Sequence, residues 1–145
     1  MAAIYTAVVT IEGGREGHAR SSDGRLDLQL TAPKADNAAP GTNPEQLFAA
    51  GYGACFESAL RSCARRAGQT LSGTRIVAHV SLNKLENNSY ALSVELHGQV
   101  EGLQPAQAME LMEAAHQLCP YSVATRGNVD VQLFVDDWAS ATVAA

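Results

Sequence analysis

Residues 43–66, NPEQLFAAGYGACFESALRSCARR, carry the signals of one long helix. Asn43 is a favoured N-cap residue, and Pro44 suits the first helical position because its missing N–H has no intrahelical partner there. Gln46 follows the cap by three residues, which predicts a capping box. The segment therefore predicts a helix from Pro44 to Arg66.

The first half of this helix is poor in charge and rich in glycine. No charged side chain occurs between residues 46 and 56, so the helix is expected to be buried on nearly all sides, partly by a second subunit. Gly51 and Gly53 each cost about 1 kcal/mol relative to alanine inside a helix. That cost predicts the close approach of another backbone at these two positions.

Alternating and helical patterns along the rest of the chain predict one further helix and several strands. The expected strands cover residues 3–12, a hairpin around Ser22-Asp23-Gly24, a hairpin of residues 75–85 with 90–100, and residues 129–135. The second helix covers residues 105–118 and ends before Pro120, and residues 31–42 form a loop. This order predicts an α+β fold in which mostly antiparallel sheet packs on two helices.

The chain has 145 residues, a length that suits one compact domain over residues 1–145 with a core of its own. Its hydrophobic fraction of 46% and charged fraction of 17% are typical of a globular protein and exclude a disordered or collagen-like chain. Residues 136–145 follow the last expected strand as an extra tail, either frayed or docked through Trp138, the only tryptophan.

Fifteen acidic and ten basic residues give a formal net charge of −5. That charge argues against nucleic acid and anionic membrane surfaces as partners. No stretch approaches the roughly 20 apolar residues of a membrane span, and the N-terminus does not resemble a signal peptide, so a cytoplasmic location is expected. Three cysteines without a CxxC motif do not form a secreted disulfide framework and are expected to rest as thiols.

Cys55 lies on one stripe of the predicted helix with Phe48, Tyr52 and Ala59. A thiol in such an apolar setting is most often a small core residue. The alternative is a nucleophile. A nucleophilic Cys55 would require a nearby positive charge to stabilise the thiolate, because apolar surroundings raise the pKa of a thiol.

Arg15 is the candidate for that charge, since the glycines of GGREG (residues 13–17) let the backbone turn sharply and present one side chain. A solvated surface charge is the simpler alternative. Glu45, in the first turn of the helix, either complements the helix dipole or holds Arg15 in a bidentate ion pair. On a continuous helix Glu45 and Cys55 lie about 15 Å apart along the axis. If Arg15 serves both, Cys55 is expected to meet the Arg15 and Glu45 of a partner subunit at a two-fold interface.

The other two cysteines are less distinctive by themselves. Cys119 ends the second helix in CPYS (residues 119–122), and Cys63 is expected to be a packing or spectator thiol. A zinc site would draw on the HxxC pair His116 and Cys119 together with Cys55, but no second close ligand pair occurs. The remaining histidines are scattered on a predicted loop or strands: His18, His79 and His97. No metal is therefore expected.

Five segments, which occur in the family's order and span nearly the whole chain, are similar to those of one protein family. They are GGREG (13–17), SSDGRLDLQL (21–30), NPEQLFAAGYGACF (43–56), AAHQLCPYS (114–122) and ATRGNVDV (124–131). On these motifs the sequence closely resembles the organic hydroperoxide resistance proteins, within the superfamily of osmotically inducible protein C.

The resemblance implies an intertwined OsmC-like homodimer that reduces organic (alkyl or lipid) hydroperoxides to alcohols in defence against oxidative stress, with two active sites at the subunit interface. It implies Cys55 as the peroxidatic cysteine and Cys119 as the resolving one. Arg15 resembles the thiolate-stabilising arginine and Glu45 its carboxylate partner. The implied cycle passes through a sulfenic acid and an intramolecular disulfide, without metal, haem or other cofactor. It ends with re-reduction by an external dithiol, typically a lipoyl-bearing protein.

Four apolar side chains are candidates for a pocket that favours alkyl or lipid hydroperoxides over hydrogen peroxide. They are Phe48, Tyr52, Phe56 and Met112, and each is as readily a core residue. The chain departs from the family pattern at few positions. Cys63 lies outside its motifs and allows a competing disulfide, Val123 stands where asparagine often follows CPYS, and the tail is longer than usual.

Three other interpretations remain open. A sibling branch of the superfamily shares the chemistry but differs in peroxide preference, although GGREG and CPYS argue against it. A non-catalytic dimer would bind a small apolar or thiol-bearing ligand and use Cys55 only as core. A cysteine hydrolase would need a histidine placed against Cys55, and no motif places one there.

Overall fold

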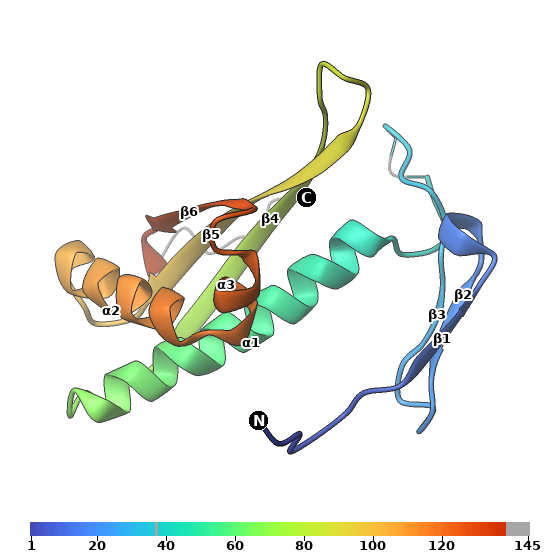
Figure 1. Ribbon diagram of the computed structural model, residues 1–145. Helices are drawn as coiled ribbons and strands as arrows, with labels where there is room; N and C mark the ends of the chain where they lie inside the picture. The colour runs from blue at the N-terminus through green and yellow to red at the C-terminus, as the bar shows by residue number, and fades with distance from the viewer. Residues whose placement is uncertain (37, 139–145) are drawn as a thin grey trace. The chain divides into compact units, whose positions relative to one another are not determined.

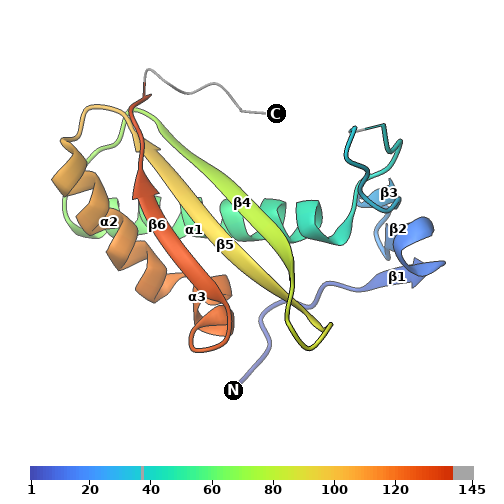
Figure 2. The same ribbon diagram turned by 90° about the horizontal axis from the view of Figure 1, so that it is seen from above.

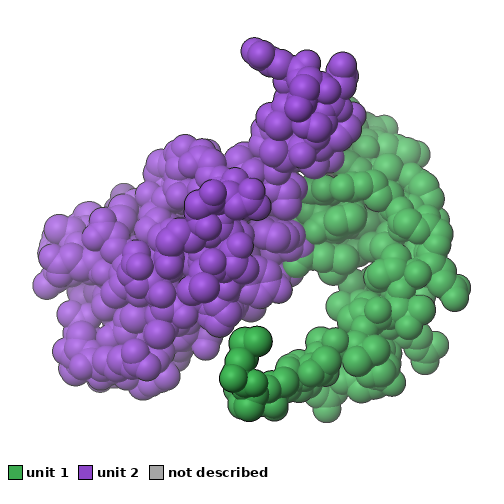
Figure 3. All heavy atoms as spheres, viewed as in Figure 1, with its two compact units in different colours: residues 1–47 green, residues 48–145 purple. Residues whose placement is uncertain are grey.

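A computed structural model describes residues 1–36 and 38–138 of the chain (Figure 1). The chain forms two compact units, Met1–Leu47 and Phe48–Ala145 (Figure 3). The single domain over residues 1–145 stays a prediction. None of the described helices is both long enough and apolar enough to span a bilayer.

The first unit contains a three-stranded antiparallel sheet in the order β1-β2-β3. Its strands are β1 (Val9–Glu12), β2 (His18–Ser21) and β3 (Asp27–Gln29). The predicted hairpin around the Ser22-Asp23-Gly24 turn is confirmed. The predicted first strand, residues 3–12, is wrong over residues 3–8, because the pairing with β2 covers residues 9–12 and ends at the hydrogen bond of 2.9 Å from the Ser22 N–H to the Val8 carbonyl.

A double-glycine turn connects β1 to β2. Gly13 and Gly14 have φ values of 76° and 56°, a left-handed conformation that glycine adopts without the steric penalty of a Cβ atom. The turn continues as the short 3-10 helix η1 (Gly14–Glu16), which carries Arg15. The Glu16 carboxylate accepts a hydrogen bond of 3.1 Å from the Ala32 N–H, so the turn is tied to the predicted loop, residues 31–42.

The long helix α1 covers Pro44–Arg66, as predicted. The side chain of Asn43 caps its start by accepting a hydrogen bond from the Gln46 N–H at 2.8 Å. The expected reciprocal bond of a capping box is replaced. The Gln46 side chain instead accepts a hydrogen bond from the hydroxyl of Thr42 at 2.7 Å.

The second unit is built on the three-stranded sheet β4-β5-β6. Strands β4 (Thr74–Lys84) and β5 (Tyr90–Val100) form the predicted antiparallel hairpin, and β6 (Asp130–Val135) pairs with β5 in parallel. Helix α2 (Pro105–Leu118) lies in the connection from β5 to β6. The helices of this unit lie on one face of the sheet (Figures 1 and 2). The predicted α+β class is therefore confirmed.

A third, short helix was not predicted. Helix α3 (Pro120–Thr125) starts immediately after the residue that ends α2. Pro120 stops α2 as expected, but proline also suits the first position of a new helix, and six residues are too few to show a periodic pattern. Cys119 therefore lies at the junction of two helices.

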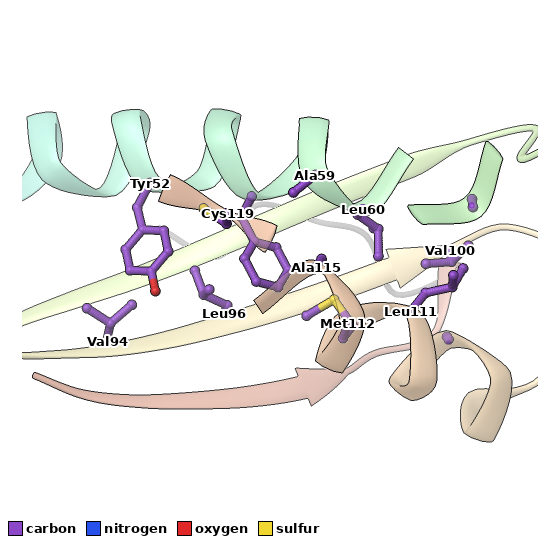
Figure 4. Close-up of a cluster of buried hydrophobic side chains, with 13 residues drawn as sticks. Tyr52, Ala59, Leu60, Val94, Leu96, Val100, Leu111, Met112, Ala115 and Cys119 are labelled. Atoms are coloured by element: carbon purple, nitrogen blue, oxygen red, sulfur yellow. The ribbon is translucent and has the colours of Figure 1, made fainter. Parts of the chain in front are cut away.

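The core of the second unit lies between its helices and sheet (Figure 4). Its fully buried members include Tyr52, Phe56 and Leu60 from α1, Leu96 from β5 and Met112 from α2. The expectation that α1 is buried on nearly all sides, partly by a second subunit, stays a prediction. The side chains of Ala50, Ala54 and Ser58 are exposed on one stripe of the helix.

The described part of the tail is docked. The guanidinium carbon of Arg75 lies 4.9 Å from the centroid of the Trp138 ring, within cation–π range. The Trp138 ring also covers Gly73, where an added Cβ would lie 2.8 Å from the ring. Residues 139–145 lie outside the described residues.

Candidate active site

The sulfur atoms of Cys55 and Cys119 lie 3.5 Å apart. Cys55 comes from the middle of α1, and Cys119 from the junction between α2 and α3. Cys119 is fully buried, whereas Cys55 is partly exposed. The fold thus joins two thiols far apart in sequence and leaves one of them accessible.

The surroundings of Cys55 within the described residues do not favour its thiolate. Burial is the main influence that raises the pKa of Cys55 above its ordinary value, and the neighbouring Cys119 thiol raises it further. The backbone amide of Tyr121 acts in the opposite direction, because its N–H favours a negative sulfur. No cationic side chain appears among these influences in the part of the chain that the structure describes.

An aromatic group borders the two cysteines. The Tyr121 ring stacks on Tyr52 with centroids 5.5 Å apart, and Phe48 meets Tyr121 edge-on at 6.0 Å. A Cβ atom added to Gly51 would lie 2.5 Å from the Tyr121 hydroxyl oxygen. The expected close approach at Gly51 is therefore made by a side chain and not by a backbone. At Gly53 an added Cβ would meet Ala78 of the same chain at an ordinary 3.7 Å, so a close backbone approach there stays a prediction.

A buried polar network lies beside this group and was missed from the sequence. The Tyr52 hydroxyl is hydrogen-bonded to the Ser122 hydroxyl at 2.9 Å and to the Thr125 hydroxyl at 3.3 Å. The His116 Nδ1 is 2.8 Å from the same Ser122 oxygen. The only available signal was the position of Ser122 and Thr125, three and six residues after Cys119, on a helix too short to recognise.

The His116 imidazole is held toward its neutral form. Burial is the main influence that lowers the pKa of His116, and the positive charge of Arg126 lowers it further. Arg126 also donates a hydrogen bond of 2.7 Å to the backbone carbonyl of His116. A neutral ring can accept or donate at Nδ1, and so it can pair with the Ser122 hydroxyl in either sense.

Arg15 and Glu45 form the predicted bidentate ion pair in the first unit. Two guanidinium nitrogens of Arg15 donate to the two carboxylate oxygens of Glu45 at 2.9 and 2.8 Å. The hydrogen bonds from Arg15 are the main influence that lowers the pKa of Glu45, and those to Glu45 raise the pKa of Arg15. The Glu45 side chain is 13% exposed and the Arg15 side chain 45%, so the carboxylate anchors a partly exposed guanidinium.

The proposed pocket residues lie mostly in the core. Tyr52, Phe56 and Met112 are fully buried, and Phe48 is partly buried against them. The four side chains therefore occupy positions typical of core residues, which is the alternative that the sequence left open. Their part in a substrate pocket stays a prediction.

The histidines are less scattered than the sequence suggested. Among the described residues, one group of side chains is arranged as metal ligands are, namely His79, Glu95 and His97 on neighbouring strands. The zinc site considered at His116, Cys119 and Cys55 has no counterpart among these groups. Cys63 is partly buried and packs against the core, as expected of a spectator thiol.

The sequence profile of the family described as OsmC-like protein matches residues 34–134. The chain belongs to this family. Within it, the chain is 47% identical over 133 residues to the organic hydroperoxide resistance protein OhrB of Bacillus subtilis, covering 90% of this chain and 97% of that protein. It is 46% identical to an organic hydroperoxide resistance protein of Xanthomonas axonopodis pv. citri, with 90% and 93% covered.

A solved structure shows the same fold. The crystal structure of an organic hydroperoxide resistance protein from Legionella pneumophila superposes with a TM-score of 0.87 at 44% identity, covering 93% of this chain and 99% of that one. The resemblance to the organic hydroperoxide resistance proteins of the OsmC-like family is therefore confirmed over most of the chain.

Proposed function

We propose that this protein is a thiol-dependent peroxidase that reduces organic hydroperoxides to alcohols in defence against oxidative stress. The observation that carries the proposal is the 3.5 Å separation of the Cys55 and Cys119 sulfur atoms in a member of this family. That spacing leaves the two thiols close enough to form a disulfide after a small movement.

The difference in exposure supports a separate role for each thiol. Cys55 is partly exposed and attacks the outer oxygen of ROOH as a thiolate, so the O–O bond breaks and the alkoxide leaves as ROH after taking a proton. Cys55 is then a sulfenic acid. The buried Cys119 attacks the Cys55 sulfur as a thiolate, the disulfide forms, and hydroxide leaves as water.

The Arg15–Glu45 pair supplies the positive charge that this chemistry needs. Because burial raises the pKa of Cys55, its thiolate is scarce at neutral pH unless a cation stabilises it. The Arg15 guanidinium stabilises the thiolate and the charge that develops on the leaving oxygen. Glu45 binds two guanidinium nitrogens and so fixes the direction in which Arg15 points.

We assign this pair to the Cys55 of a partner subunit in an intertwined homodimer. Helix α1 is continuous between Glu45 and Cys55 and rises about 1.5 Å per residue, so the two residues lie about 15 Å apart along its axis. The exposed Ala50 and Ala54 of α1 help to line a groove of about 510 Å³ beside residues 75–78 of β4. An uncovered stripe of small apolar side chains is a surface that a two-fold partner would cover.

The cycle closes with an external dithiol. A lipoyl group on a partner protein suits this step, because its first thiol attacks the Cys55–Cys119 disulfide and its second releases the mixed disulfide intramolecularly. The cytoplasmic location, where such dithiols would be available, stays a prediction.

Intact mass and peptide mapping of the reduced protein test the proposal. One equivalent of an alkyl hydroperoxide is expected to remove two hydrogens rapidly, mapped to Cys55–Cys119, and faster than hydrogen peroxide does. Cys63→Ser is the matched control and should react like the wild type. No rapid change, or a disulfide that involves Cys63, would overturn the proposal and favour a ligand-binding dimer.

A further inference from the structure

Four side chains capable of binding a metal meet on the face of the second sheet that does not carry the helices. The register of the β4–β5 hairpin places His79 opposite Glu95, and His97 follows Glu95 by two residues on the same face. The intervening Leu96 points into the core. The fourth residue, Asp136, directly follows β6, and its N–H continues the strand pairing by donating to the Gly98 carbonyl at 2.9 Å.

The ligand atoms of three of these residues are close to metal-binding distances. His97 Nε2 lies 3.3 Å from Glu95 Oε2, and His79 Nδ1 lies 3.9 Å from the same oxygen. One ligand atom from each residue lies within 4.8 Å of the others. In a tetrahedral zinc site with bonds of about 2.0–2.1 Å, neighbouring ligand atoms are about 3.3 Å apart. One pair already has this spacing, and the others need only small side-chain movements.

The His97 ring is oriented as a metal-binding imidazole usually is. Its Nδ1 lies 3.0 Å from the Asp136 carboxylate, which selects the tautomer with the proton on Nδ1. The Nε2 lone pair then faces the Glu95 carboxylate. Two acceptors at this distance repel each other unless a cation or a second ring proton lies between them.

Ring packing holds His97 in this orientation. The Phe134 ring stacks on it with centroids 4.6 Å apart and an interplanar angle of 14°. The His79 ring lies over it at 4.8 Å. The His97 side chain is 19% exposed, whereas those of His79 and Glu95 are 50% and 48% exposed. A fixed and mostly covered ligand thus lies beside two ligands that are about half exposed.

We propose that His79, Glu95 and His97 bind a divalent transition-metal ion of the zinc class, with Asp136 as the residue that positions His97. Two imidazoles and one carboxylate suit such an ion and not calcium or magnesium, which prefer oxygen ligands. Water completes the coordination. The site is independent of the cysteine chemistry, and because its ligands come from both β4 and β5, bound metal stabilises the second unit.

Zinc titration followed by ring-nitrogen NMR of the four histidines tests the proposal. Zn²⁺ is expected to shift the signals of His79 and His97 and to leave those of His18 and His116 unchanged. The same measurement separates this site from zinc bound by the thiols, because thiol binding would not move the His79 and His97 signals. Shifts absent from both rings at saturating Zn²⁺ would overturn the proposal.

Calorimetric titration of variants adds a quantitative test. His97→Ala and His79→Ala should each weaken Zn²⁺ binding at this site by at least about 10-fold, and Asp136→Asn by about 10- to 100-fold through the orientation of His97. His18→Ala is the matched control, because His18 pairs with Asp27 at 2.6 Å and is about as exposed as His79. An equal loss in His18→Ala, or none in His79→Ala, would contradict the proposal.

Zn²⁺ should also raise the melting temperature of the wild type but not that of His97→Ala.

Discussion

The partly exposed sulfur of Cys55 lies 3.5 Å from the fully buried sulfur of Cys119. In the proposed cycle, this relationship makes Cys55 react before Cys119, because a peroxide in solution reaches Cys55 first. In the same cycle the nearby second thiol protects Cys55, since it removes the sulfenic acid before further oxidation.

We predict that Cys119→Ser separates the two halves of the cycle. One equivalent of alkyl hydroperoxide should still consume the Cys55 thiol at nearly the wild-type rate, but the product should gain one oxygen instead of losing two hydrogens. Excess peroxide should then oxidise Cys55 irreversibly to sulfinic acid. Mass spectrometry with a sulfenic-acid trap measures both products. A disulfide still formed in this variant would mean that Cys63 takes the resolving role.

Arg15→Ala should raise the pKa of Cys55 further and slow its reaction with peroxide by about 100-fold or more, the usual cost of removing a group that stabilises a developing oxyanion. Stopped-flow thiol oxidation against pH measures both quantities. Arg25→Ala is the matched control, because Arg25 is 90% exposed and approaches Asp23 at only 3.8 Å. An unchanged rate and thiolate titration in Arg15→Ala would remove Arg15 from the mechanism.

In the proposed mechanism Glu45 acts through Arg15, so Glu45→Ala should have a smaller effect than Arg15→Ala. In the Arg15→Ala background the same change should have almost no effect, since the guanidinium that it positions is gone. If Glu45→Ala slowed the double variant as much as the single one, the two residues would act separately.

The sequence was sufficient where a signal is local. The cap at Asn43 and the helical spacing gave both ends of α1, and the alternation of residues 75–85 and 90–100 gave the β4–β5 hairpin. The Arg15–Glu45 pair could be predicted because each residue lies at a recognisable feature, a double-glycine turn and a helix N-terminus. The strand prediction failed for residues 3–8 because alternation shows only that a strand is possible. It does not show that the neighbouring strand is long enough to pair with it.

The missed features depend on contacts between distant residues. Tyr52 and Ser122 are 70 positions apart, and only the packing of α1 against α3 brings their hydroxyls together. The His79 and Glu95 pair was out of reach, because pairing the predicted strands 75–85 and 90–100 end to end places Leu96 opposite His79, one residue away from the observed register. The Asp136 contact was out of reach too, since the parallel placement of β6 beside β5 leaves no local trace.

Ser122→Ala should lower the free energy of unfolding by about 1–3 kcal/mol, because Tyr52 and His116 both lose a buried hydrogen-bond partner. Urea denaturation with an unchanged m-value measures the loss. Ser72→Ala, at an exposed position outside the helices and strands, is the control and should be nearly neutral. Equal stabilities of the two variants would show that the network contributes no net stability.

The lowered pKa of His116 predicts a loss of stability in mild acid. The unfolded chain takes up a proton at His116 near pH 6.5, while the folded protein resists it, so stability is fully present above about pH 6.5 and falls as the pH drops toward the folded pKa. NMR titration of the His116 ring should give a value below 6.5. His116→Gln should remove this part of the pH dependence of the unfolding free energy. A His116 pKa at or above 6.5 would contradict the prediction.

Subunit exchange tests whether Arg15 serves the Cys55 of its own chain or of its partner. Arg15→Ala and Cys55→Ser homodimers should each react slowly or not at all with alkyl hydroperoxide. Mixing them under conditions that exchange subunits should restore up to about half of the wild-type activity per heterodimer, because one of two interface sites then combines an intact Cys55 with the Arg15 of the partner subunit. No restoration, with heterodimers shown by native mass spectrometry, would place the whole site within one chain.

Ala54→Glu adds an independent measurement, since a charge on the exposed stripe of α1 should weaken the dimer and lower the reaction rate together.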